Sequence, residues 1–199
     1  MEDLEEPFGS ARERMLIVAA QRGQAALVRL VLANGASPAL TDRAGLTALH
    51  WAARRGGAEC VAELLGAGAP VDARDRAGRT PLFDAVGAGA DPHVLGLLLE
   101  AGADPELTDA DGVRALMRAE RSQAVALLLD RGAALEAADP RGRTALMHAV
   151  LRRDADVARA LLCAGADPRR PDRDGRTPLD LAGGDPALQA LLASPPTSP

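Results

Sequence analysis

Residues 42 to 53 decide the fold of this chain, and they read Asp42-Arg-Ala-Gly45-Leu-Thr47-Ala-Leu-His50-Trp51-Ala-Ala53. The Asp-x-x-Gly stretch is typical of a turn, because glycine can take a positive φ without steric cost. Thr47 stands where a helix N-cap belongs, since its hydroxyl can accept from the unpaired amides of the first turn. The stretch therefore predicts a tight turn followed at once by a short helix.

The residues that follow predict a second helix. After Gly56-Gly57, the apolar residues Val61, Leu64 and Leu65 recur at helical spacing, and Gly68 stands where a C-cap glycine ends a helix. A turn with two short helices has one apolar face that is too small to be stable alone. Such a unit must stack on others like it.

The same pattern returns along the chain at nearly constant intervals. Five aspartates, each followed by a glycine three residues later, are separated by 33, 34, 30 and 33 residues. A second marker, a Gly-Ala pair, gives the same four intervals. Because two markers agree in phase, the chain is predicted to be an array of repeats. The aspartates are Asp42, Asp75, Asp109, Asp139 and Asp172, and the pairs begin at Gly35, Gly68, Gly102, Gly132 and Gly165.

These markers divide the chain into six copies between two short ends. The first copy lacks the threonine, and Ser10-Ala-Arg-Glu13 is expected to supply a capping box instead. The last copy is expected to have a short second helix, Pro186 to Leu192, and the tail after it is expected to be disordered. The expected segments are an acidic end 1–10, an N-terminal capping copy 11–41, copies 42–74, 75–108, 109–138 and 139–171, a C-terminal capping copy 172–193, and a tail 194–199.

Four copies carry a Thr-x-Leu motif that points to a known family. The motifs are Thr47-Ala-Leu-His50, Thr80-Pro-Leu-Phe83, Thr144-Ala-Leu-Met147 and Thr177-Pro-Leu-Asp180, and a Leu-Leu pair follows each one downstream. The chain resembles the ankyrin repeat family over about residues 11 to 193. That family's unit is a β-turn finger with two antiparallel helices. The resemblance implies an all-α ankyrin repeat solenoid of helix-turn-helix units joined by β-turn fingers, and a role in protein-protein interaction.

The fourth copy, residues 109–138, departs from the pattern. It is three residues shorter than its neighbour, and Arg114 replaces the capping threonine. Loss of a cap costs about 1 kcal/mol, so residues 109–123 are expected to be the weakest joint. A tolerated deletion would explain this copy. Alternatively, a shortened helix would open a notch for a partner, as the resemblance to ankyrin-type cyclin-dependent kinase inhibitors suggests, although there an early repeat is the shortened one.

Bulk composition limits the classes of protein that remain. Apolar residues make up 47% of the 199 residues, no run of 18 apolar residues occurs, and the first six residues are acidic rather than basic. These features predict a protein of the cytoplasm and/or nucleus that is not inserted in a membrane. Cys60 and Cys163 are expected to be reduced, packed thiols. Net charge −5 and scarce aromatic residues argue against nucleic-acid binding.

Catalytic and metal-binding patterns are missing from the sequence. No His, Cys or carboxylate group has metal-ligand spacing, and no phosphate loop or base-activated nucleophile is recognisable. His50 and His148 fall at or next to the position where ankyrin units hydrogen-bond their turn, so the resemblance implies a structural role. The chain is therefore predicted to be no enzyme and to use no cofactor or metal.

Arginine is the residue type that most suggests a binding surface. Lysine is absent, and arginines recur on the predicted fingers and at the ends of first helices. They are either solvent positions in an arginine-biased protein or, because a guanidinium suits carboxylates, a surface for a protein partner with an acidic face. Trp51 is either an interface anchor or packed between copies. We predict a monomeric adaptor or inhibitor that binds through Arg43, Trp51, Arg54, Arg55, Arg76, Arg79, Arg141, Arg143, Arg152, Arg153 and Arg176.

Overall fold

The computed structural model describes residues 11–55 and 57–194. The chain divides into two compact parts, Met1–Asp104 and Pro105–Pro199. The regular elements of the described residues are all helices, and β structure is limited to two isolated antiparallel bridges, Thr41 with Thr47 and Thr108 with Arg114. The all-α class expected from the sequence is confirmed.

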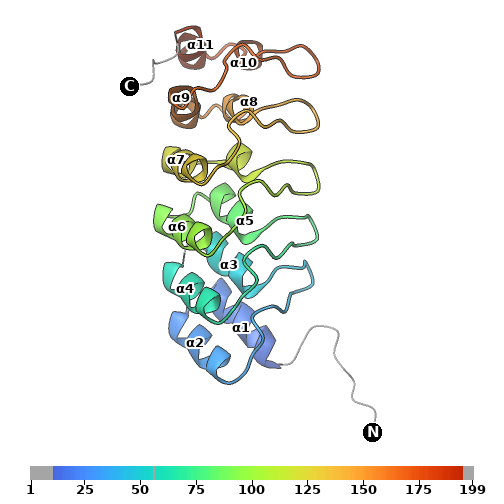
Figure 1. The fold of residues 1–199 in the computed structure, drawn as a ribbon, viewed down its shortest axis with the longest axis vertical. Coiled ribbons are helices and arrows are strands. Elements are labelled where there is room, and N and C mark those ends of the chain that lie inside the picture. Colours follow the sequence, from blue (N-terminus) through green and yellow to red (C-terminus); the bar gives the residue numbers. More distant parts are fainter. Residues whose placement is uncertain (1–10, 56, 195–199) are drawn as a thin grey trace. The chain divides into compact units, whose positions relative to one another are not determined.

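The described residues of the N-terminal part form three helix pairs. Within it, first helices pack on first helices and second helices on second helices. Alanines at the first-helix contacts, such as Ala52 and Ala85, are fully buried and allow close approach. The pairs are α1 (Ala11–Gln21) with α2 (Ala25–Ala33), α3 (Ala48–Arg55) with α4 (Ala58–Gly66), and α5 (Pro81–Gly87) with α6 (Pro92–Glu100), as labelled in Figure 1.

Residues 105–194 of the C-terminal part also form three pairs, but the first of these pairs opens with a single 3₁₀ turn. Its α8 packs against both η1 and α10, and its α9 packs against both α7 and α11. The pairs are η1 (Ala115–Arg118) with α7 (Ser122–Asp130), α8 (Ala145–Leu151) with α9 (Ala155–Cys163), and α10 (Pro178–Leu181) with α11 (Pro186–Ala193).

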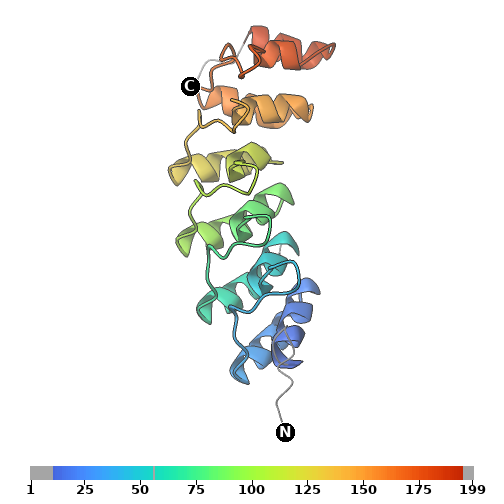
Figure 2. The same cartoon turned by 90° about the vertical axis from the view of Figure 1, so that its right-hand side faces the viewer.

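The loops that begin at the repeated aspartates form fingers, which we define as residues 42–46, 75–79, 109–113, 139–143 and 172–176. Within each part they project from the side of the first helices, and Figure 2 views them end on. Neighbouring fingers are joined by backbone hydrogen bonds, from the Arg76 amide to the Ala44 carbonyl at 3.0 Å and from the Arg173 amide to the Arg141 carbonyl at 2.9 Å. The expected fingers are thus present.

The expected helix caps are present in the regular copies. Thr80 Oγ1 accepts the amide of Phe83 at 3.2 Å, and Thr144 Oγ1 accepts the amide of Met147 at 3.5 Å. Thr177 forms a capping box with Asp180. Prolines occupy the first helical turn at residues 81 and 178, where no amide is needed. The capping box predicted at Ser10, and residues 195–199 of the predicted tail, lie outside the described residues.

The fourth copy is irregular in the way its length predicts. Its first helix is reduced to the four-residue 3₁₀ helix η1, and the N-cap Arg114 makes no side-chain capping bond. The guanidinium instead contacts two other groups: Nη1 donates to the Ala138 carbonyl at 3.4 Å, and Nε lies 3.3 Å from a Glu106 carboxylate oxygen.

The last copy differs in part from expectation. Its second helix α11 begins at Pro186 as expected and has eight residues, one fewer than the other second helices. The larger shortening is in its first helix α10, which has only four residues and which the sequence did not predict to be short. The reason is Gly183, which takes a φ of +58° directly after the C-cap Ala182 and ends α10 early. Leu179 is 45% exposed, although the matching leucines of the earlier motifs are at most 3% exposed. Those leucines are Leu49, Leu82, Leu116 and Leu146.

The two cysteines differ in burial. Cys60 is packed inside α4, as predicted, but Cys163 is exposed. The prediction that both thiols are packed is therefore wrong for Cys163, because it is the last residue of α9 and lies on the outer side of that helix. No helix in the described part of the chain is long and apolar enough to span a bilayer.

Candidate protein-interaction surface

Each finger is organised by its aspartate. In the finger of residues 75–79, Asp75 Oδ1 accepts the amides of Ala77 and Arg79, both at 2.9 Å. Gly78 takes a φ of +75° and donates its amide to the Asp75 carbonyl at 2.9 Å. One carboxylate oxygen of the aspartate is therefore used by its own turn. The same two amide contacts, to the second and fourth following residues, are made by Asp42, Asp109, Asp139 and Asp172.

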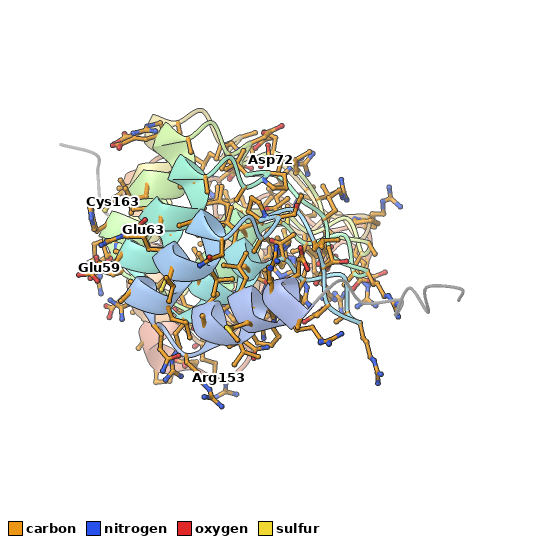
Figure 3. The ribbon with its side chains drawn as sticks, turned by 90° about the horizontal axis from the view of Figure 1, so that it is seen from below. Glu59, Glu63, Asp72, Arg153 and Cys163 are labelled. Atoms are coloured by element: carbon orange, nitrogen blue, oxygen red, sulfur yellow. The ribbon has the colours of Figure 1, made fainter. Side chains whose placement is uncertain are left out.

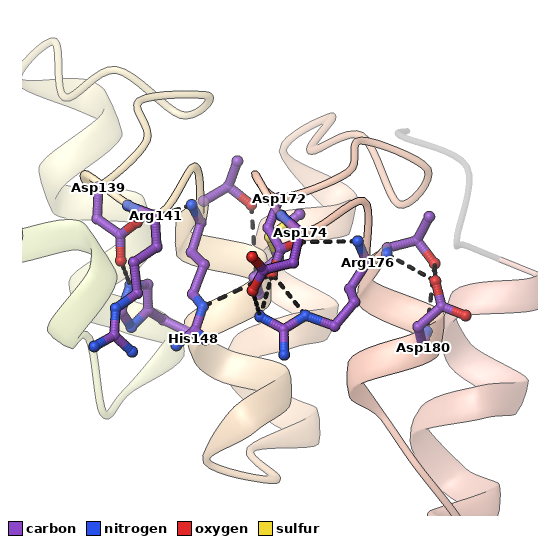
Figure 4. A network of polar contacts seen from close by, with 11 residues as sticks. Asp139, Arg141, His148, Asp172, Asp174, Arg176 and Asp180 are labelled. Carbon is purple, nitrogen blue, oxygen red and sulfur yellow. Dashed lines mark hydrogen bonds and ion pairs between the residues drawn. The ribbon is translucent and has the colours of Figure 1, made fainter.

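The other carboxylate oxygen can be taken by a donor from the first helix. Trp51 Nε1 donates to Asp42 Oδ2 at 2.9 Å, and His148 Nε2 donates to Asp139 Oδ2 at 3.0 Å (Figure 4 shows the second pair). In both copies the donor lies nine residues after the aspartate. Trp51 and His148 thus tie a first helix to its own finger.

Where the ninth residue cannot donate, an arginine four residues after the aspartate replaces it. Arg79 Nε and Nη2 lie 2.9 and 2.6 Å from Asp75 Oδ2. Arg176 Nε and Nη2 lie 3.1 and 3.0 Å from Asp172 Oδ2, in a copy whose ninth residue is Leu181. These charge-assisted bonds make Arg79 and Arg176 parts of their fingers.

Arg143 occupies the same place as these two arginines but is held differently. His148 already takes its finger's aspartate, and Arg143 Nε lies 3.9 Å from Asp172 Oδ2, across to the next finger. That Nε is buried without a hydrogen bond within the described residues. Arg143 is therefore a half-buried charge between two fingers.

Arg152 also has a structural environment. Its Nη1 donates to the Met117 carbonyl at 2.7 Å and its Nη2 to the Ala119 carbonyl at 2.6 Å. These two carbonyls lie in and just after η1, which is too short to pair them in a helical ladder. Burial lowers the pKa of Arg152. Arg152 thus satisfies the backbone that the shortened helix leaves unpaired.

The remaining candidates of the N-terminal part lie on fingers and on α3. Trp51 is half-buried, and the guanidinium carbon of Arg54 lies 5.3 Å from its ring centroid. Arg43, Arg55 and Arg76 are exposed. The structure therefore brings an aromatic ring and one arginine into contact and leaves other arginines at the surface of the same part.

The remaining candidates of the C-terminal part are Arg141 and Arg153, both exposed; Arg173, a further finger arginine, is exposed beside them. Arg153 has a φ of +60°, a conformation in which glycine stands at the matching positions Gly23 and Gly89. Its side chain points away from the helices (Figure 3). Asp174 is exposed on the same finger as Arg176 and is ion-paired with it, so the C-terminal fingers carry both signs of charge.

His50 is structural, as expected. The Thr47 amide donates to His50 Nδ1 at 3.1 Å, so Nε2 is assigned the proton and donates to the Arg79 carbonyl at 3.0 Å. Burial lowers the pKa of His50. His50 thus connects the start of helix α3 to the next finger.

No group of three or more potential metal ligands occurs in the described part of the chain.

Asp84 was missed at the sequence level. It occupies the first-helix position of Trp51 and His148, but as a carboxylate it cannot donate to Asp75. Its side chain is 5% exposed, Oδ1 lies 3.8 Å from Arg79 Nε, and Oδ2 has no hydrogen-bond partner among the described residues. Burial raises its pKa. The sequence does contain a feature that could have identified Asp84, because it is the one acidic residue in the otherwise apolar helix that follows Thr80.

The geometry described above is that of stacked finger-and-helix-pair repeats. A family model described as ankyrin repeats (3 copies) matches residues 16–109, 88–172 and 116–197. The chain belongs to the ankyrin repeat family. Ankyrin repeats generally serve as protein-protein interaction modules and are typically non-enzymatic.

A solved structure gives the same result. The chain is similar to the ankyrin repeat domain of Bcl-3, described as a unique member of the IkappaB protein family, with 32% sequence identity and a TM-score of 0.76. The match covers 90% of this chain and 81% of that domain's chain. A search of curated proteins gives no match.

Proposed function

We propose that this protein is a non-enzymatic interaction module that presents arginines of its fingers and first helices to a protein partner with an acidic face. The supporting observation is the division of the arginines into two groups. Arg79, Arg143, Arg152 and Arg176 are engaged with or directed at groups of the chain itself. The other candidate arginines, Arg43, Arg54, Arg55, Arg76, Arg141 and Arg153, are exposed, and Arg43 among them also interacts within the chain.

The exposed group is proposed to make the direct contacts. Guanidinium groups suit carboxylates and attract them over a Debye length of about 8 Å at physiological salt. Arg79, Arg143 and Arg176 are proposed to hold the fingers in place, and Arg152 is proposed to hold the short helix η1, so that all four support the surface without giving up their own contacts. The proposed contact residues are Arg43, Trp51, Arg54, Arg55, Arg76, Arg141 and Arg153, and the proposed supporting residues are Arg79, Arg143, Arg152 and Arg176.

A general role in protein-protein interaction follows from the ankyrin repeat family. This proposal adds that the arginine surface is the binding site, that the partner is acidic, and that the protein is a monomeric adaptor or inhibitor in the cytoplasm and/or nucleus. Absence of nucleic-acid binding is a further part, supported by the net charge of −5. The C-terminal fingers carry the exposed acidic residues Asp111 and Asp174, whereas the N-terminal fingers carry no acidic residue besides their turn aspartates Asp42 and Asp75. This difference in charge favours the N-terminal part as the stronger site for an acidic partner.

The test is affinity capture of cellular proteins at two salt concentrations. Charge reversal of Arg54, Arg55 and Arg76 to glutamate is expected to abolish capture of a salt-sensitive partner. A matched control reverses Arg22, Arg121 and Arg159, which are also exposed but lie outside the fingers and first helices. A partner kept by the first variant, or lost equally in the control, would refute the proposed surface.

A regulator that binds through the irregular fourth copy, in the manner of ankyrin-type kinase inhibitors, is the second candidate. The 3₁₀ helix η1 supports it, because the first helix is indeed reduced there. Arg152 argues against it, because its guanidinium already takes the carbonyls that the short helix leaves unpaired. Capture that survives the arginine reversals but fails when this copy is restored to full length would favour the second candidate.

A further inference from the structure

Arg54 is held against an aromatic ring. Its guanidinium lies over the indole of Trp51, 5.3 Å from the ring centroid. The indole itself is fixed, because Trp51 Nε1 donates to Asp42 Oδ2 at 2.9 Å. Asp42 is in turn fixed by the amides of its own finger. The finger thus orients a tryptophan, and the tryptophan offers Arg54 a defined aromatic face.

Contact with the ring leaves the N–H groups of this guanidinium without a hydrogen-bond acceptor. The attraction between a cation and the face of an aromatic ring does not replace hydrogen bonds to its five N–H groups. No N–H group of Arg54 donates to another residue in the described ranges, and the side chain is exposed. Arg79, by contrast, uses two of its N–H groups on Asp75.

We infer that Trp51 and Arg54 form a stacked anchor that binds one oxyanion of the partner, a carboxylate or a phosphorylated side chain, through the N–H groups of the guanidinium. This inference rests on the proposed function and identifies Arg54 as the main contact residue of the proposed arginine surface. A planar fork matches two oxygens of an oxyanion with parallel hydrogen bonds, which a lysine ammonium cannot do. Because the stack already restrains the side chain, less rotamer entropy is lost on binding.

Asp84 is the competing anion within the chain. Its side chain is 5% exposed, and its Oδ2 has no hydrogen-bond partner in the part of the chain that the structure describes. Burial raises the pKa of Asp84, and the charges of Arg79, Arg54 and His50 act in the opposite direction. The Asp84 carboxylate is therefore attracted by the guanidinium of Arg54, which is the group that the partner would bind. Removing its negative charge should strengthen the anchor.

The experiment measures binding of a fluorescein-labelled octaglutamate peptide, and of an octapeptide containing phosphoserine, by fluorescence anisotropy. Trp51 is the only tryptophan of the chain, so its emission reports binding at the anchor directly. The central variant is Arg54→Lys, which keeps the charge but loses the planar fork. The matched control is Arg55→Lys, which makes the same change at the neighbouring exposed arginine. Asp84→Asn tests the competing anion.

We expect Arg54→Lys to weaken binding about fivefold or more, Arg55→Lys to weaken it less than about twofold, and Asp84→Asn to tighten it about twofold. Trp51 emission should change on binding. If the two lysine variants lose affinity equally, or if Trp51 emission stays constant while peptide binds, the anchor is refuted and the arginine surface stands. Binding of the phosphoserine peptide alone, with the same dependence on Arg54, assigns a phosphorylated partner. If neither peptide binds the unaltered protein, the proposed function fails together with the anchor.

Discussion

His148 donates from Nε2 to Asp139 Oδ2 at 3.0 Å, which ties helix α8 to the finger that precedes it. Asp139 also accepts two amides of its own finger through Oδ1. The carboxylate therefore joins a turn and a helix that are nine residues apart in sequence. Trp51 and Asp42 repeat this relationship in the N-terminal part, where the donor is an indole rather than an imidazole.

The histidines predict a loss of stability in mild acid. Burial lowers the pKa of both His148 and His50 from 6.5. The unfolded chain therefore binds protons at a higher pH than the native protein, and the free energy of unfolding should fall as pH decreases below about 6.5. Urea unfolding at about pH 7.5 and about pH 5.5 measures this change. His148→Gln should reduce the difference, and His93→Gln, at an exposed histidine, should leave it intact.

Replacement by asparagine is predicted to change the free energy of unfolding in opposite directions at Asp139 and at Asp84. Burial raises the pKa of Asp139, but hydrogen bonds from the amides of Arg143 and Arg141 and from His148 outweigh it and lower the pKa overall. Its charge stabilises the fold above the unfolded pKa, and that stability is lost as pH falls through the folded pKa. Asp84 has a raised pKa, so its stability contribution is full below the unfolded pKa and is lost as pH rises.

At neutral pH, Asp139→Asn should therefore lower the free energy of unfolding by about 1 to 2 kcal/mol, and Asp84→Asn should raise it by about 1 kcal/mol. Chemical denaturation of both variants beside the unaltered protein measures the pair. Changes of the same sign would mean that Asp84 is satisfied by contacts other than those described above.

The fold was predictable because each copy carries several independent signals. Thr80 with Pro81 marks a helix start, and Gly78 and Gly68 mark a turn and a helix end. The length of α10 was not predicted, because a single residue, Gly183, ends this helix early. The Gly183-Gly184 pair in the sequence would have indicated this early helix end.

The candidate surface was less predictable, because spacing alone does not say which arginines are already paired. Whether the fourth-position arginine binds its aspartate depends on the ninth residue, as Arg79 and Arg143 show. The contact of Arg152 with Met117 joins residues 35 positions apart and comes from the fold of two copies together. That the exposed arginines bind a partner stays a prediction.

Arg152 predicts a large effect on stability. Its two hydrogen bonds reach the carbonyls of Met117 and Ala119, which are both buried residues. Arg152→Ala would leave these acceptors without a partner, at a cost of about 2 to 3 kcal/mol. The measurement is urea unfolding, with Arg153→Ala as a control that removes an adjacent exposed arginine. Equal effects of the two substitutions would contradict the capping role of Arg152.

Arg153 predicts a stabilising substitution. Its φ of +60° lies in the left-handed region, where a side chain costs about 1 to 2 kcal/mol and glycine costs little. Glycine also gains entropy in the unfolded chain, which offsets about 0.4 to 1 kcal/mol of the benefit. Arg153→Gly should therefore raise the free energy of unfolding by about 0.5 to 1 kcal/mol. Arg153→Ala, which removes the same charge but keeps the Cβ, should give no gain in the same unfolding measurement; a gain equal to that of glycine would show that the charge, and not the backbone, is responsible.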